Sequence, residues 1–307
     1  MATMMAHRSC RPEAHGDYWS MPIDFDVAPV RIRVLGCSGA IGAGQRTTAF
    51  LLDDRVLLDC GTGVGELTVE EMAQIDDVVL THAHLDHVQL LPMLAEVACE
   101  TRMIPGGRGP IRVHALPETL EALRSHLFNG VIWPDFLRIP SVDQPTLTLH
   151  PFAVGDTLRL GTGRATRRLL LLPAAHAVPA CGIAVDTAEG WWVFTGDSGP
   201  HDTCWSMLAG IPIAQLVADV SFPNEQAALA ERAGHLIPAT LARLLQRLPG
   251  SIPVHVSHLK TGDADRVMTQ VWSIDTPHRV SRLVREQRFE MAAAGDAVTD
   301  AVARAGR

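Results

Sequence analysis

Three histidines and an aspartate stand within six residues of this chain, in the order His82-Ala83-His84-Leu85-Asp86-His87. They follow directly on the apolar run Val78-Val79-Leu80-Thr81, which predicts that they form a turn from a strand into a helix. Imidazole and carboxylate groups are ligands that first-row transition metals favour, and one turn lets all four converge. A chance surface cluster would explain one histidine but not four convergent ligands. The motif therefore predicts a metal centre, and it requires a fold that holds this turn rigidly.

The composition describes a chain that buries a large core and carries an acidic balance of charge. The chain has 307 residues, 47% of them hydrophobic, and this length allows one or two domains. The formal net charge of −8 argues against a large nucleic-acid partner, because proteins that grip phosphates normally present a basic surface. The charge does not argue against a small phosphorylated ligand.

We expect a cytoplasmic protein that does not enter a membrane. No stretch approaches the ~18 apolar residues that span a bilayer, and residues 1–26 lack the apolar segment of a secretory signal. The six cysteines form no Cys-x-x-Cys pair, which favours free thiols in a reducing compartment. Cys60 and Cys181 stand next to apolar runs and are expected in the core.

Strands dominate both halves of the chain, and helices are interspersed among them. Strands are expected at residues 30–35, 48–52, 56–60, 76–81, 111–115, 147–152, 169–172, 182–186, 191–195 and 217–221. Helices are expected at residues 88–98, 117–128, 224–233, 238–248 and 263–271, and over 280–307 before the chain frays. This order predicts an α+β fold with helix–sheet–sheet–helix (αββα) layers. We expect an arm at 1–28, a single domain at 29–285 with an insertion at about 100–145, and a partly helical tail at 286–307.

Three further candidate ligands each follow an apolar run in the second half of the chain. His176 follows Leu169–Pro173, Asp197 follows Trp192–Gly196, and His258 follows Ile252–Ser257. Strand ends are where a rigid scaffold aims loop side chains at one point. Each residue alone is more commonly a satisfied core or edge residue. Together, and in this order after the histidine motif, the three predict a site for two metals.

This order of residues resembles the metallo-β-lactamase fold superfamily, from about Arg31 to Lys260, and Asp59 matches the aspartate usually found just outside its metal ligands. The resemblance implies two mixed sheets flanked by helices. Within the superfamily, four segments resemble the class II 3′,5′-cyclic-nucleotide phosphodiesterases: His126–Pro134, Ser221–Asn224, Gly234–Pro238 and Ser257–Lys260. The helix after the metal motif departs from that family at Leu90, Pro92 and Glu96, which puts substrate preference in doubt more than metal binding.

The resemblance implies how the ligands are shared between two metals. One metal takes His82, His84 and His176, the second takes Asp86, His87 and His258, and Asp197 bridges them. The ligands are all nitrogen and oxygen, which suits zinc first and also admits manganese or iron. Two such ions roughly 3.5–4 Å apart share a water whose pKa falls towards ~7. The metal-bound hydroxide would attack phosphorus in line and open cAMP or cGMP to the 5′-monophosphate.

The leaving ribose oxygen must be protonated or held by a metal, and His235 is the candidate proton donor. In the RNA-processing branch of the superfamily, a histidine at this stage of the chain pairs with an acidic residue. Asp219 occupies that place here and, with the ligand Asp86, completes the predicted catalytic set. A solvated strand end would equally explain Asp219, and a helix-entry position would explain His235.

Three residues are candidates for holding the substrate. Lys260 offers a point charge for a phosphate oxygen, although an ordinary surface lysine would look the same. Asn129 and Asn224 offer hydrogen bonds to ribose or base, but asparagine also favours turns. His201 is rejected as an eighth ligand because seven ligands already satisfy two metals. Four further histidines have no partner pattern and are expected to be structural or on the surface: His114, His150, His255 and His278.

Four alternatives to the cyclic-nucleotide reaction remain open. An RNA-processing nuclease shares the metals and the His235/Asp219 pair, but the net charge counts against it. A lactone or ester hydrolase shares the metal core and differs in the substrate segments. A non-catalytic binding module would have no reason to keep seven converging polar residues. Electron transfer is opposed because no glutamate replaces His84. Base preference and oligomeric state are not readable, and a homodimer is left open.

Overall fold

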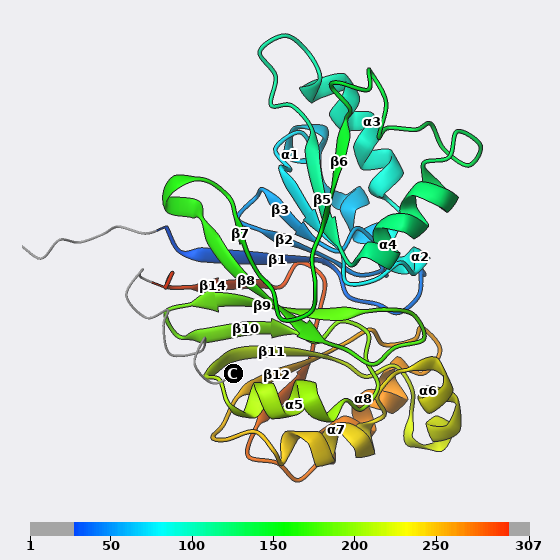
Figure 1. Ribbon diagram of the computed structural model, residues 1–307. Coiled ribbons are helices and arrows are strands. Elements are labelled where there is room, and N and C mark those ends of the chain that lie inside the picture. The colour runs from blue at the N-terminus through cyan, green and yellow to red at the C-terminus, as the bar shows by residue number, and fades with distance from the viewer. Residues whose placement is uncertain (1–27, 295–307) are drawn as a thin grey trace, which may run out of the picture.

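The computed structural model describes residues 28–294, and these form two stacked β-sheets with helices on both outer faces (Figure 1). The first sheet has the strand order β14-β1-β2-β3-β4-β5-β6. Its strands are β14 (Arg288–Met291), β1 (Val30–Gly36), β2 (Ala49–Leu52), β3 (Val56–Leu58), β4 (Asp77–Val79), β5 (Ile111–Ala115) and β6 (Leu147–Pro151). Pairing is antiparallel from β14 to β3 and parallel from β3 to β6, so the sheet is mixed.

The second sheet has the order β13-β12-β11-β10-β9-β8-β7. Its strands are β13 (Arg279–Arg282), β12 (Pro253–Ser257), β11 (Ile213–Asp219), β10 (Gly190–Phe194), β9 (Cys181–Thr187), β8 (Arg167–Pro173) and β7 (Thr157–Leu160). Pairing is antiparallel from β7 to β10 and parallel from β10 to β13. The predicted αββα sandwich of two mixed sheets is therefore confirmed.

The helices lie in two groups. The first group covers the first sheet and consists of α1 (Val69–Met72), α2 (Leu85–Val88), α3 (Leu91–Arg102) and α4 (Pro117–Ala122), which continues as a π-turn at Leu123–Leu127. The second group consists of α5 (Asp202–Ala209), α6 (Ala227–Ala233), α7 (Pro238–Leu245) and α8 (Ala264–Trp272), and Figure 1 shows α5, α7 and α8 beneath the second sheet. Short 3-10 turns occur at Thr62–Glu66, Gly163–Ala165 and Asn224–Gln226. No described helix has the length and apolar character needed to cross a bilayer.

The short strands β2 and β3 are apolar throughout, which suits their position with both faces buried. In β2, Phe50 and Leu52 face the core between the sheets, whereas Leu51 faces the core under the first helical group. The ring of Phe50 packs against those of Trp192 and Phe194 from the second sheet, with centroids 5.4 and 4.9 Å apart. Truncation of such a buried ring to alanine lowers the free energy of unfolding by about 3–5 kcal/mol, so the packing of Phe50 contributes strongly to holding the two sheets together.

The helix expected over residues 280–307 is wrong wherever the structure describes it. The segment instead forms β13 and β14, and β14 pairs with β1 so that Met291 lies opposite Val30. The sequence Arg288-Phe-Glu-Met291 alternates in polarity, which is the period of a half-buried strand, and Phe289 and Met291 are buried. The sandwich thus extends beyond residue 285. The arm at 1–27 and the end of the tail at 295–307 lie outside the described residues.

Elements that were not expected include α1, β7 and α5, and one expected helix is divided. β7 and α5 appear in segments for which no element was predicted, and the His201 side chain caps α5 by accepting a hydrogen bond from the Cys204 backbone N–H at 3.2 Å. The helix expected at 88–98 is split into α2 and α3 at residues 89–90. Pro92 stands in the first turn of α3, where its missing N–H costs no hydrogen bond. This break keeps the metal motif in a short turn of its own.

Candidate metal centre

The predicted ligands lie in loops at the ends of strands from both sheets. Residues 82–87 follow β4 and enter α2, while His176 follows β8, Asp197 follows β10, and His258 follows β12. Parallel pairing of β10, β11 and β12 places their carboxyl ends at one edge, and the strands of the other sheet end beside them. The structure therefore brings all seven predicted ligands together, and their role as ligands stays a prediction.

The ligand atoms divide into two neighbouring groups. One group is His82, His84 and His176, and the other is Asp86, His87, Asp197 and His258, with potential ligand atoms within 4.8 Å of one another in each group.

Asp197 is the residue between the groups. Its Oδ2 lies 3.3 Å from His87 Nε2 and 3.1 Å from His258 Nε2. The same oxygen lies 3.9 Å from His82 Nε2 and 4.0 Å from His176 Nε2. This arrangement matches the predicted division of ligands, with one carboxylate shared between both sides.

Hydrogen bonds from outside the groups fix which nitrogen of each ring faces inward. His87 Nδ1–H donates to the buried carboxylate of Asp59 at 2.7 Å, and Asp59 also accepts from the Thr81 backbone N–H at 2.8 Å. His176 Nδ1–H donates to the Gly234 carbonyl at 2.9 Å. Each Nε2 therefore keeps its lone pair for a metal, which is the usual function of such partners.

Several buried atoms of the cluster have no hydrogen-bond partner among the described residues: His82 Nε2, His87 Nε2 and Asp197 Oδ1. Each such unsatisfied group lowers the stability of the fold by about 1–3 kcal/mol, and a bound metal ion would remove this penalty. Burial is the main cause that lowers the pKa of His82, His84 and His176, which favours the neutral form that binds metals. The donor set of imidazole nitrogens and carboxylate oxygens, with no thiolate, fits divalent metal ions.

The charges of the second group are arranged differently. Burial would raise the pKa of Asp197, but the neighbouring His258 and His87 outweigh it and hold that pKa well below its ordinary value. Burial would likewise lower the pKa of His87, and the carboxylates of Asp197 and Asp59 reverse the effect and raise it well above the ordinary value. The two carboxylates thus favour positive charge at the centre of this group, which a divalent cation would supply.

His235 and Asp219 form a pair directly beside the cluster. His235 Nδ1–H donates to Asp219 Oδ2 at 2.6 Å, and the His235 ring centroid lies 5.0 Å from that of His176 and 5.1 Å from that of His258. Burial acts to lower the pKa of His235, but the Asp219 carboxylate outweighs it and the pKa is raised. Asp219 is fully buried, so it is not a solvated strand end. The ring is held as a proton donor would be.

The three predicted substrate residues each form hydrogen bonds with the backbone, and their role in substrate binding stays a prediction. Lys260 Nζ donates to the Gly39 carbonyl at 2.9 Å. Asn129 Oδ1 accepts from the backbone N–H groups of Val131 and Ile132, as a turn residue does. Asn224 Oδ1 accepts from the Ala239 N–H at 2.8 Å, in the first turn of α7. Both asparagine oxygens are thus used by the backbone.

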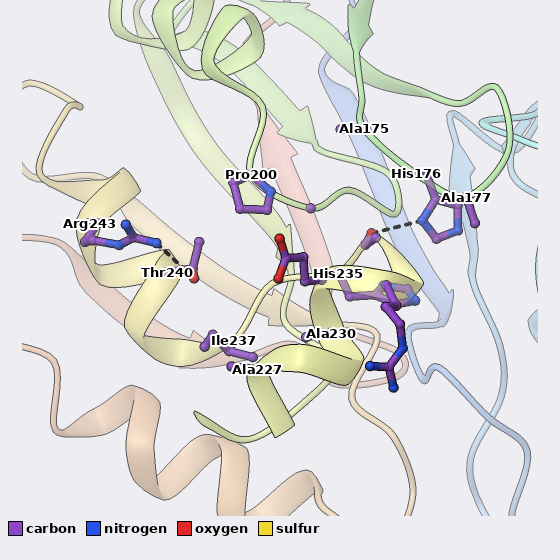
Figure 2. A pocket seen from close by; sticks show the side chains of 14 residues that line it. Ala175, His176, Ala177, Pro200, Ala227, Ala230, His235, Ile237, Thr240 and Arg243 are labelled. Carbon is purple, nitrogen blue, oxygen red and sulfur yellow. Dashed lines mark hydrogen bonds between the residues drawn. The ribbon is translucent and has the colours of Figure 1, made fainter. Parts of the chain in front are cut away.

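A cavity of about 700 Å³ borders the cluster through His176 and His235. Figure 2 shows it between these two rings and the wall formed by α6 and α7, with Arg243 and Thr240 on α7 on the side away from His176. Arg232 and Arg243 line it, and neither forms an ion pair with any described residue. Sequence reasoning missed both arginines because they look like ordinary helix-surface residues.

The β-lactamase superfamily domain matches residues 54–256, so the chain belongs to this superfamily. It is 26% identical over 294 residues to a probable 3′,5′-cyclic-nucleotide phosphodiesterase of Yersinia pestis, covering 79% of this chain and 81% of that protein. It is 27% identical over 259 residues to a ribonuclease Z of Bradyrhizobium, covering 68% of this chain and 83% of that protein. The fold is similar to that of unliganded yeast PDE1, with a TM-score of 0.68 and 16% identity over 85% of this chain and 99% of that one. The metallo-β-lactamase fold protein YhfI of Bacillus subtilis gives a TM-score of 0.67 and 19% identity over the same shares.

Proposed function

We propose that this metallo-β-lactamase-fold hydrolase is a binuclear phosphodiesterase that opens 3′,5′-cyclic nucleotides to 5′-monophosphates. One observation carries the proposal: two ligand groups share Asp197, and the His235–Asp219 pair lies directly beside them at the wall of a cavity. The similarity to the probable phosphodiesterase of Yersinia pestis, which extends over most of both chains, supports the same substrate class. We propose zinc as the metal, with manganese or iron as alternatives.

When bound, two divalent ions would supply a water acidic enough to be a nucleophile at neutral pH and would draw charge from the phosphoryl oxygens. The chain supplies the remaining chemistry. As water adds to phosphorus and releases a proton to solvent, the bond from phosphorus to the ribose 3′-oxygen breaks, and that oxygen takes the proton of His235 Nε2–H; His235 then regains a proton from solvent. Asp219 holds His235 by its Nδ1–H and stabilises the charged ring before transfer. The raised pKa of His235 favours the protonated form that a proton donor needs.

The cavity is suited to the nucleoside. Its volume of about 700 Å³ lies within the usual range for small-molecule sites. Ile237, Ala227 and Pro200 give it apolar surface. Arg232 and Arg243, against the single carboxylate of Glu231, give the lining a net positive charge that attracts an anionic substrate. The five free cysteines among the described residues favour a reducing, cytoplasmic location.

A ribonuclease is the second candidate, because the similarity to ribonuclease Z covers about two thirds of this chain. The His235–Asp219 pair could also donate a proton to the ribose leaving group of RNA. The net charge of −8 counts against it, since RNA binding depends on neutralising phosphates. A lactone or ester hydrolase has less support, because such leaving groups need less help from a proton donor.

The test is hydrolysis by purified, metal-loaded protein of cAMP, cGMP and a tRNA precursor, with products separated by chromatography. The proposal predicts 5′-AMP and 5′-GMP and an intact precursor. Intact cyclic nucleotides with a cleaved precursor would replace the proposal by the ribonuclease.

A further inference from the structure

The hydroxyl of Ser221 lies between the metal ligands and the proton donor. Ser221 is fully buried two residues after Asp219, just beyond the end of β11. Its Oγ lies 2.7 Å from Asp219 Oδ1, 2.9 Å from His258 Nδ1 and 3.2 Å from His235 Nδ1. It also lies 3.0 Å from the His258 carbonyl oxygen. One side chain is thus in contact with a predicted ligand, the carboxylate and the candidate donor.

Counting protons decides the direction of these bonds. A hydroxyl has one proton and two lone pairs, whereas an ionised carboxylate only accepts. The contact to Asp219 Oδ1 is the shortest and is charge-assisted, so Ser221 donates there. Asp219 Oδ2 is already taken by His235 Nδ1–H at 2.6 Å. The Oγ lone pairs of Ser221 therefore face His258 Nδ1, and Ser221 Oγ accepts a hydrogen bond from His258 Nδ1–H.

We propose that Ser221 is a positioning residue that fixes His258 in the Nδ1–H form and ties this ligand, through Asp219, to His235. The inference rests on the metal centre of the proposed function. With its proton on Nδ1, His258 directs the Nε2 lone pair at the place where Asp86 Oδ2 and Asp197 Oδ2 meet, 3.2 and 3.1 Å away. Such a juxtaposition of lone pairs is favourable only around a cation.

The backbone restrains His258 from the other side. His258 has a left-handed backbone with φ of 60°, and a Cβ placed on Gly39 would come within 2.7 Å of His258 Nδ1. The ring is therefore confined between the Gly39 backbone and the Ser221 hydroxyl. Removing the hydroxyl leaves the Nδ1–H without its acceptor and leaves the ring free to carry its proton on Nε2, where it competes with the metal.

The test compares Zn²⁺ binding by chelator competition in the full chain and in the variants Ser221→Ala, Ser221→Thr and Ser281→Ala. Ser281 is the matched control, because its Oγ lies 3.0 Å from His255 Nδ1 in the same kind of contact outside the cluster. We expect Ser221→Ala to weaken one of two bound zinc ions about 10- to 100-fold and to leave the other unchanged. Ser221→Thr keeps the hydroxyl and restores binding, and Ser281→Ala binds as the wild type does.

Unchanged binding of both ions by Ser221→Ala would overturn the proposal, and so would equal weakening of both in a folded protein. If Ser221→Ala does not fold, Ser221→Cys serves instead, because a thiol is a weak donor and acceptor in the same position. The readout involves no nucleotide. A failure to cleave cAMP or cGMP therefore refutes the proposed substrate without touching this inference.

Discussion

Replacing Asp59 by asparagine changes one atom far below the surface and tests how the second ligand group is held. Asp59 is fully buried, and its carboxylate accepts from His87 Nδ1–H, from the Thr81 N–H and from the Thr81 hydroxyl. An amide keeps an acceptor for Thr81 but turns an N–H₂ group towards His87. His87 must then accept at Nδ1 and carry its proton on Nε2, the atom that faces the metal.

The size of the effect follows from these contacts. The bond at 2.7 Å joins a carboxylate to an imidazole in a dry site, and hydrogen bonds to charged groups contribute about 1.5–3 kcal/mol. Loss of such a partner weakens metal binding about 10- to 100-fold, which corresponds to about 1.4–2.7 kcal/mol. We therefore expect Asp59→Asn to weaken zinc binding by this factor and to lower the free energy of unfolding of the metal-free protein by a similar amount.

The assays are chelator competition for zinc and urea unfolding of the metal-free protein. Asp77→Asn is the matched control, because Asp77 is equally buried and its Oδ1 lies 2.8 Å from His114 Nε2. This pair is not part of the metal cluster. It should lose stability and keep its zinc affinity. Wild-type zinc affinity in Asp59→Asn would refute the reasoning that this bond fixes His87.

Three further predictions concern the donor, the cavity and the response to pH. His235→Asn should lower kcat for cyclic nucleotides by about a hundredfold or more while zinc content stays unchanged, as measured by steady-state kinetics and metal analysis; a fall of less than tenfold would remove His235 as the donor. Arg243→Gln should raise KM by about two- to fivefold with little change in kcat, whereas Arg247→Gln, whose arginine pairs with Asp202, should not; equal effects would mean that the cavity does not hold the substrate. Burial lowers the pKa of His255 to about 4 from 6.5, so the unfolded chain takes up this proton first as the pH falls, and stability decreases between these two values. Urea unfolding should show that the free energy of unfolding of the wild type falls by up to about 2 kcal/mol from pH 7 to pH 5, and that His255→Gln lacks this fall. Identical pH profiles of the two proteins would contradict the prediction.

The convergence of the seven candidate ligands could be predicted from the sequence because each stands in a local pattern. The histidine motif occupies one turn, and His176, Asp197 and His258 each mark the end of an apolar strand. The pairing of β14 with β1 could not be predicted, because it joins opposite ends of the described chain and depends on the whole first sheet. The alternation over residues 288–291 was present in the sequence, but it is too short to exclude a helix by itself.

The contacts around the ligands were less accessible. Ser221 lies in a segment that was singled out only because it resembles the phosphodiesterase family. Its proposed role depends on a tertiary contact, because the residues after β11 and after β12 must come within 3 Å of each other. Asn129 and Asn224 show the same limit, since the backbone uses the oxygen of each side chain, in a turn for Asn129 and at the start of α7 for Asn224. Composition and spacing identify which groups are present, while tertiary contacts decide which of them are free to act.

The most direct test of the account is hydrolysis of cAMP and cGMP, beside bis(p-nitrophenyl) phosphate, by the wild type and His84→Ala with the metal content of both determined. The account predicts about two metal ions per chain in the wild type, and cleavage of the cyclic nucleotides by the wild type but not by His84→Ala. Cleavage of the generic diester alone would keep the metal centre and contradict the cyclic-nucleotide assignment.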